Sequence, residues 1–161
     1  MLVATIREWQ YKQMEDNIKA VEWLVRSSEP QALMTFRDGG SGWTVLEVVC
    51  HLRDFEKVFH ERARRTVEQD NPPLPFPDPD ALAREGRYSE QGLEAALAAW
   101  QERRASLLAY LRSRDGADWE RPAQHPTRGE MSLFDQLFLV PQHDSLHLEQ
   151  MTRTLYEKKK G

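Results

Sequence analysis

Apolar residues recur every three or four positions in four long segments, and this helical period constrains the fold more than any other feature of the sequence. The segments cover about residues 6–27, 44–69, 90–113 and 132–156. Each stripe covers one face of a helix, so the four helices can bury their apolar faces against one another. The period therefore predicts an all-α fold, a four-helix bundle formed by residues 1–161 as a single domain.

The connection between the second and third segments, residues 70–89, is long and rich in proline. Its prolines are Pro72, Pro73, Pro75, Pro77 and Pro79. Proline disrupts the interior of a helix and the middle of a sheet, so we expect neither here. About 20 extended residues reach up to ~60 Å, whereas a helix of about 25 residues is only ~37 Å long. The connection can therefore run the length of the bundle, which lets the second and third helices lie parallel.

Three local signals refine the last three segments and the connection between the third and the fourth. Thr44 and Glu47 fit a capping box at the start of the second segment, in which each side chain bonds the backbone amide of the other residue. Pro141 interrupts the fourth segment and predicts a bend just before His143. Residues 118–129, which contain Pro122, are expected to form a loop between the third and fourth helices.

The charge of the chain argues against a nucleic-acid-binding surface. Lys and Arg number 22 against 26 Asp and Glu, which gives a formal net charge of -4. Nucleic-acid binders normally carry a clustered basic excess. Arginines do gather at 62–65 and 103–104, but acidic residues stand beside them, which is typical of solvated helix faces.

Cysteine usage and hydropathy bear on the compartment. Cys50 is the single cysteine, so an internal disulfide is excluded and a reducing compartment fits. The first residues lack the basic start and apolar run of a signal peptide. No apolar stretch approaches the ~20 residues that cross a bilayer. We expect a cytoplasmic protein without a membrane partner.

Three histidines form the candidate metal site. His143 and His147 are four residues apart in the fourth segment, so both rings project from one helix face, where their nitrogens suit a divalent ion. His51 lies within the buried stripe of the second segment and is the candidate third ligand. Three protein ligands leave a position open for water or substrate. Two simpler interpretations stay open, a chance pair for His143 and His147 and a hydrogen-bonded core histidine for His51.

The remaining candidates are interpreted structurally. We expect His60 to face solvent and His125 to cap a loop. Cys50 lies ~100° away from His51 round the helix, so we do not expect it to share the metal, and we interpret it as a small apolar filler. Arg104 interrupts the stripe of the third segment and has two interpretations. Either its long side chain reaches past the edge of the core, or it binds an anionic ligand group.

Two stretches resemble the signatures of the DinB/YfiT-like superfamily. Residues 42–56, GWTVLEVVCHLRDFE, resemble the first signature, and residues 143–150, HDSLHLEQ, resemble the last. Residues 100–104 and the stretch from Trp119 to Leu133 are also similar to this family. The resemblance covers about residues 10–156, nearly the whole chain.

The resemblance implies a four-helix bundle with up-down-down-up connection and a long crossover between its second and third helices. It also implies a divalent metal, nickel or zinc, held by three histidines that match His51, His143 and His147. Members of the family with assigned chemistry are thiol-dependent transferases and isomerases that use mycothiol, bacillithiol or glutathione. The expected partners are therefore a low-molecular-weight thiol and a small electrophilic substrate.

Metal-assisted attack by such a thiol is the working hypothesis, with Arg104 as a candidate to orient anionic parts of the thiol. A metal-dependent hydrolase is the second enzymatic hypothesis, but the segment His-Asp-Ser-Leu-His lacks the glutamate base of His-Glu-x-x-His proteases. Only Asp54 or Asp144 is left for that role. Two non-enzymatic functions also fit the sequence, a metal-binding bundle of the stress response and a plain helical dimerisation module.

Two further residues are candidates to orient the ligands. Asp54 follows His51 by three residues and Gln150 follows His147 by three, so each can bond a ligand imidazole and fix its tautomer. A homodimer is also expected as an option, because Trp9 and Trp119 suit either a dimer interface or core packing.

Overall fold

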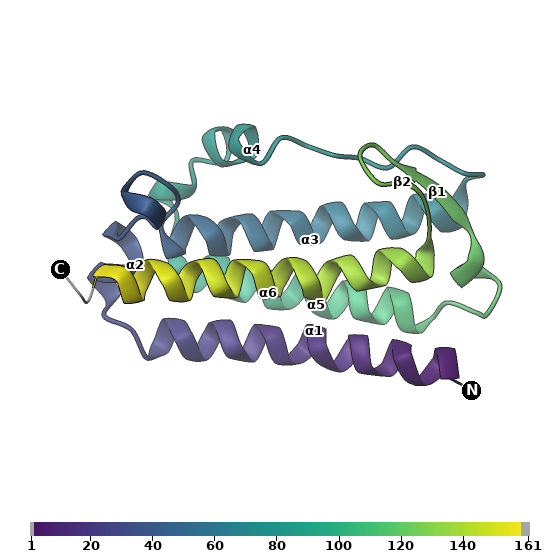
Figure 1. Cartoon of the computed structure of the whole chain (residues 1–161), viewed down its shortest axis with the longest axis horizontal. Helices are drawn as coiled ribbons and strands as arrows, with labels where there is room; N and C mark the ends of the chain where they lie inside the picture. Colours follow the sequence, from purple (N-terminus) through teal and green to yellow (C-terminus); the bar gives the residue numbers. More distant parts are fainter. Residues whose placement is uncertain (1, 159–161) are drawn as a thin grey trace.

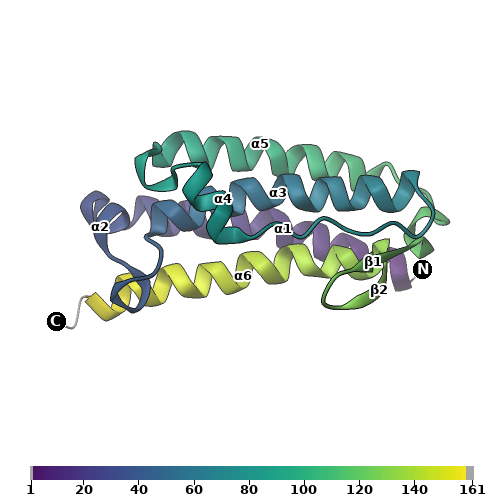
Figure 2. The same ribbon diagram turned by 90° about the horizontal axis from the view of Figure 1, so that it is seen from above.

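The computed structural model describes residues 2–158, with the side chains of residues 5–156. Four long helices lie side by side along its length, as Figures 1 and 2 show. They are α1 (Leu2–Arg26), α3 (Val45–Glu68), α5 (Leu93–Arg112) and α6 (Leu133–Lys158). The four predicted segments and the four-helix bundle are thus confirmed.

The order of the helices is up-down-down-up. In Figure 1, α1 runs away from the end that holds the N-terminus, α3 returns, α5 repeats the direction of α3, and α6 runs back beside α1. Helix α3 packs against both α5 and α6, and α1 packs against α6 and α5. The parallel pair α3 and α5 requires the long crossover that the proline-rich connection predicts.

That crossover contains a helix, so the expectation of no helix in residues 70–89 is wrong. Helix α4 (Pro79–Glu85) begins with proline, and the Asp78 side chain accepts a hydrogen bond of 2.9 Å from the Asp80 amide. Proline is tolerated in the first turn because the amide that it lacks has no partner there anyway. The same placement starts α2 (Pro30–Thr35). Three short 3-10 turns complete the helical elements: η1 (Asp38–Gly40), η2 (Tyr88–Glu90) and η3 (Asp118–Glu120).

A small β-ribbon stands where a loop is expected. Strands β1 (Pro122–His125) and β2 (Gly129–Ser132) pair antiparallel. The ribbon also holds the start of the crossover, because the Leu74 amide donates to the Gln124 carbonyl and the Gln124 amide donates to the Pro72 carbonyl. Each strand is only four residues long, which is too short for an alternating apolar and polar pattern to stand out. This explains why the sequence predicted a loop here.

The capping box at the start of α3 is confirmed. The Thr44 hydroxyl accepts from the Glu47 amide at 3.2 Å, and the Glu47 carboxylate accepts from the Thr44 amide at 2.7 Å. From this start the apolar stripe of α3 enters the core, where Val48, Val49 and Leu52 are buried. His51 follows the same face, two turns from the cap.

Arg104 neither leaves the core nor faces a ligand, so both interpretations of it are wrong. The residue is 1% exposed, and its guanidinium joins three helices. It donates to Glu56 of α3 at 2.6 Å, to Asp144 of α6 at 2.8 Å, and to the Met14 carbonyl of α1 at 2.7 Å. Two carboxylates neutralise this buried arginine. Both lie far from it in the sequence, so the sequence pattern did not reveal the pairing.

The burial of two tryptophans and of Arg62 bears on the remaining predictions. Trp119 packs in the core and Trp9 is exposed. Arg62 is buried, so the expectation that arginines 62–65 form a solvated face is wrong for its first member. Within residues 2–158, no helix combines the length and the apolar character that a membrane span requires.

Candidate metal centre

Helices α3 and α6 bring the three predicted histidines together. The Nε2 atoms of His51 and His143 are 3.0 Å apart. One ring nitrogen from each of His51, His143 and His147 lies within 4.8 Å of the other two. The ring centroids are 5.0 Å apart for His51 and His143, 4.6 Å for His51 and His147, and 4.5 Å for His143 and His147.

Aromatic side chains form the wall of this cluster. The His51 ring lies 4.3 Å from Phe55 and 4.9 Å from Trp43, between ring centroids. The His143 ring stacks on Phe55 at 5.1 Å and meets Phe59 edge-on at 5.3 Å. His51 is only 2% exposed, whereas His143 and His147 are half-buried. The surroundings are therefore apolar on the α3 side and more open on the α6 side.

This environment keeps the imidazoles neutral. Burial, with the neighbouring His147, lowers the pKa of His51 to about 3. Burial also holds the pKa of His143 well below its ordinary value. It lowers the pKa of His147 too, although the hydrogen bond that His147 donates to Gln150 acts to raise it. Neutral rings keep a lone pair free for coordination. Three neutral nitrogen donors converging on one point fit a divalent transition-metal ion.

A chain of hydrogen bonds fixes the tautomer of His147. Asp38 holds Gln150 by accepting from its Nε2 at 3.1 Å, and Arg153 in turn holds Asp38 with both nitrogens of its fork. The amide oxygen of Gln150 therefore faces His147 Nδ1, at 2.8 Å. An oxygen acceptor requires the proton on Nδ1 and leaves the Nε2 lone pair free. The expectation that Gln150 orients His147 agrees with these contacts.

Asp54 does not orient His51, and that expectation is wrong. Its carboxylate accepts from Arg53 at 2.9 Å, from Arg103 at 2.8 Å and from the Tyr88 hydroxyl at 2.8 Å. Burial would raise the pKa of Asp54, but these hydrogen bonds outweigh it and lower the pKa to about 2. Asp144 likewise accepts two hydrogen bonds from Arg104. Neither aspartate is a free base beside the histidines.

The other predicted side chains have structural roles. His60 is half-buried against Tyr110, so the expectation that it faces solvent is wrong. His125 accepts a hydrogen bond from the Thr127 amide at 3.3 Å, as a cap would, although it belongs to β1 rather than to a loop. Cys50 is fully buried, and burial raises the pKa of its thiol to about 11. Its role as an apolar filler is confirmed.

Comparison with known proteins decides the family. A protein-family model described as the DinB superfamily matches residues 13–151 of the chain. The chain belongs to the DinB superfamily. A protein of Oceanobacillus iheyensis, named as a candidate metal-dependent hydrolase, is 26% identical over 148 residues, which are 91% of this chain and 84% of that protein.

Two solved structures share the DinB fold. YfiT from Bacillus subtilis is described as a probable metal-dependent hydrolase with an unusual four-helix bundle topology. It superposes with a TM-score of 0.85 at 24% identity and covers 95% of this chain and 87% of its own. A mycothiol-dependent maleylpyruvate isomerase superposes with a TM-score of 0.73 at 11% identity, over 90% of this chain and 60% of its own. At these identities the likeness is one of fold.

In this DinB-superfamily protein, sequence reasoning missed the surroundings of the cluster. Asp38 supports Gln150 from a turn 112 positions away in the chain. Trp43 and Phe59 close the aromatic wall. Arg62 lies three residues beyond Phe59 on the helix face that His51 and Phe55 share, and this spacing is the signal that could have identified it.

Proposed function

We propose that this protein is a metal-dependent enzyme in which His51, His143 and His147 hold one divalent ion, nickel or zinc. In the proposed reaction a low-molecular-weight thiol attacks a small electrophilic substrate. The observation that carries the proposal is the convergence of three neutral imidazoles, two of them with Nε2 atoms 3.0 Å apart. Both ions accept three such nitrogen donors.

The chain would contribute orientation and a dry environment. A divalent ion with three protein ligands keeps one position open and lowers the pKa of a thiol that binds there. Gln150 holds a proton on Nδ1 of His147, so Nε2 is the donor atom. Trp43, Phe55 and Phe59 shield the imidazoles from water, which strengthens every electrostatic interaction at the site.

The nucleophilic sulfur would come from a second molecule. Cys50 is the chain's single cysteine, and its thiol is fully buried with a raised pKa. A thiol of that kind is inert because the thiolate is the reactive form. The S–H bond of the supplied thiol would break and its proton would pass to solvent. Its sulfur would then form a bond to the electrophilic carbon as the bond between that carbon and the leaving group breaks, and the leaving group would depart with the bonding electron pair. The isomerase among the fold relatives is named as mycothiol-dependent, which supports this class of co-substrate.

A metal-dependent hydrolase is the second candidate. The names of the Oceanobacillus relative and of YfiT favour it. Hydrolysis benefits from a base that takes a proton from the attacking water. Because arginines hold both Asp54 and Asp144, no carboxylate in residues 5–156 is available beside the histidines for this role. The thiol reaction needs no such base and is therefore placed first.

Metal content tests the site itself. The protein is expressed without a histidine tag, purified without an immobilised-metal column, and its metal is measured by mass spectrometry. We expect about one nickel or zinc ion per chain, and loss of that ion in His51→Ala, His143→Ala and His147→Ala. His60→Ala is the matched control and keeps the ion. Unchanged stoichiometry in the three variants rejects the site.

Activity separates the three functional candidates. The metal-loaded protein is incubated with glutathione, cysteine, bacillithiol or mycothiol and a chloronitroarene electrophile, and separately with a nitrophenyl ester. Thiol transfer above the rate of free metal supports the transferase. Ester hydrolysis without thiol transfer supports the hydrolase instead. Bound metal with neither reaction supports the non-catalytic metal-binding bundle.

A further inference from the structure

A pocket adjoins the proposed metal site. It encloses about 220 Å³ and includes His143 in its wall. A pocket of this size suits a small molecule rather than a peptide. Two arginines and a second histidine also line it, namely Arg62 of α3, Arg128 of the β1–β2 turn and His125 of β1. None of its lining side chains, all within the described part of the chain, is acidic.

Arg62 is a buried cation without a counter-ion. It is 4% exposed, and among residues 5–156 no carboxylate pairs with it. Its Nε donates to the Pro75 carbonyl at 2.8 Å, while its Nη2 is buried and has no hydrogen-bond partner in the described residues. Arg104, by contrast, meets two carboxylates at a similar depth. A buried guanidinium that no carboxylate of the described residues neutralises is free to pair with an anion from outside.

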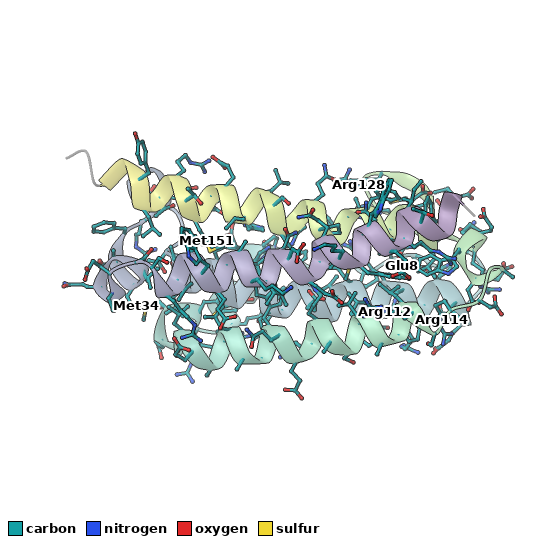
Figure 3. The ribbon with its side chains drawn as sticks, turned by 90° about the horizontal axis from the view of Figure 1, so that it is seen from below. Glu8, Met34, Arg112, Arg114, Arg128 and Met151 are labelled. Carbon is teal, nitrogen blue, oxygen red and sulfur yellow. The ribbon has the colours of Figure 1, made fainter. Side chains whose placement is uncertain are left out.

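Two phenyl rings pack against the Arg62 guanidinium, and Arg128 adds a second positive charge to the pocket. It lies over the rings of Phe59 and Phe76, at 5.7 and 5.9 Å from the centroids. Burial and the charge of Arg128 lower the pKa of Arg62 to about 10, so it remains protonated at neutral pH. Arg128 is exposed at the ribbon, where Figure 3 labels it. The positive charge of this pocket contrasts with the formal net charge of -4 of the whole chain.

Most of the remaining lining is apolar, and Thr127 and Gln142 are its uncharged polar members. Phe55 and Phe59 of α3 and Leu139 of α6 line the pocket, and both phenyl rings contact the His143 ring. Two exposed apolar side chains also line it, Phe76 at 53% and Leu146 at 64% exposed. Such a lining suits a ligand with an apolar body and one anionic end.

We propose that this pocket binds the carboxylate of a small organic acid through Arg62 and Arg128, with the apolar body of the acid lying along Phe55 and Phe59 toward the three histidines. The two positive charges suit a carboxylate, and the phenyl rings favour a weakly hydrated organic anion over inorganic phosphate. The role of the pocket rests on the proposed metal-dependent reaction, for which it would select anionic substrates. Binding of the acid itself does not depend on that reaction.

Calorimetric titration of the zinc-loaded full chain tests this inference with benzoate and its neutral isostere benzamide. We expect benzoate to bind at least about tenfold more tightly than benzamide, since a hydrogen bond to a charged group is worth that much or more. Arg62→Met should weaken benzoate about tenfold and leave benzamide unchanged. Arg128→Ala, an exposed change that spares the core, should weaken benzoate by a smaller factor. Arg64→Ala, on the same helix but outside the pocket, should change neither.

His147→Ala distinguishes this pocket from the ion. His147 does not line the pocket, so this variant should lose the metal and still bind benzoate in an Arg62-dependent way. Equal binding of benzoate and benzamide, or benzoate binding that survives both arginine substitutions, overturns the inference. Benzoate binding that disappears in His147→Ala also overturns it, because the acid would then be held by the ion. If the unmodified protein takes up no metal and still binds benzoate in an Arg62-dependent way, the proposed function is rejected and the pocket is kept.

Discussion

At the scale of single residues, His147 shows how one hydrogen bond decides which atom of a side chain is available. Its Nδ1 faces the Gln150 oxygen, and Gln150 cannot turn because its nitrogen donates to Asp38. The free lone pair is therefore on Nε2 before any ion arrives. Such an arrangement lowers the entropy that coordination has to remove.

Substitution of Gln150 should consequently weaken metal binding without removing a ligand. We expect Gln150→Leu to lower zinc affinity by about 10–100-fold, measured by competition with a chromophoric chelator. Gln101→Leu on α5, whose amide donates to Glu22, is the matched control. An affinity equal to that of the unmodified protein would contradict a positioning role for Gln150.

The lowered pKa of His51 predicts how the metal-free protein responds to acid. The pKa falls from 6.5 in the unfolded chain to about 3 in the folded one. Between these values the unfolded chain binds a proton that the folded chain does not. Above pH 6.5 this histidine does not reduce the free energy of unfolding. As the pH falls from 6.5 toward 3, it lowers the free energy of unfolding by up to ~1.4 kcal/mol per pH unit.

Urea denaturation in the presence of a chelator measures this dependence. Between pH 6.5 and 5 most carboxylates stay ionised, so the slope in that window reports histidines. His51→Phe should reduce the slope by the share of one histidine. A slope that this substitution leaves unchanged would show that His51 is not the buried neutral group that its surroundings indicate.

At the scale of secondary-structure elements, the Arg104 cluster links helices that are far apart in sequence. Arg104 on α5 bonds Glu56 on α3 and Asp144 on α6, and Asp144 precedes the His147 turn. Trp100 also donates to Glu56, at 3.2 Å. Because Asp144 directly follows His143, the cluster anchors α6 to α3 and α5 beside this histidine.

Removal of the cation alone should be strongly destabilising. We expect Arg104→Met to lower the free energy of unfolding by ~3–5 kcal/mol, because Glu56 and Asp144 would remain buried without a partner. Replacing the pair as well, with Glu56→Leu and Asp144→Leu, should recover most of that loss. Urea denaturation measures both.

An exposed pair supplies the control for this comparison. Arg112 donates to Glu15 at 2.8 Å at the surface, so Arg112→Met should change stability by no more than ~1 kcal/mol. Figure 3 labels Arg112 on this outer face. Equal effects of Arg104→Met and Arg112→Met would contradict the importance of burial for the cluster.

At the scale of the whole molecule, the up-down-down-up order places α3 directly beside α6. A cluster with ligands from these two helices ties the second long segment of the chain to the last. Ion binding should therefore stabilise the entire bundle rather than one helix, since the unfolded chain does not assemble the three rings.

Thermal unfolding tests this coupling. Addition of zinc or nickel at about 1,000 times the dissociation constant should add ~4 kcal/mol to the free energy of unfolding and raise the Tm. A chelator should reverse the shift, and His143→Ala should abolish it. A Tm that ignores the ion in the unmodified protein would contradict binding by the folded state.

The sequence by itself determined the local features. Helical periods placed the four long helices, the pair Thr44 and Glu47 placed the start of α3, and the proline-rich stretch required a crossover. Histidine spacing put His143 and His147 on one helix face. These features depend on residues within a few positions of one another, where backbone geometry alone sets the relationship.

Only the tertiary structure decided what lies opposite each side chain. It brought His51 to His143 across 92 positions, gave Arg104 two carboxylates, and left Arg62 with none. It also occupied Asp54 with Arg103 from another helix. The period of a stripe indicates which face is buried, but the partner on that face depends on how far two helices are shifted along each other. Packing of the whole core sets that shift.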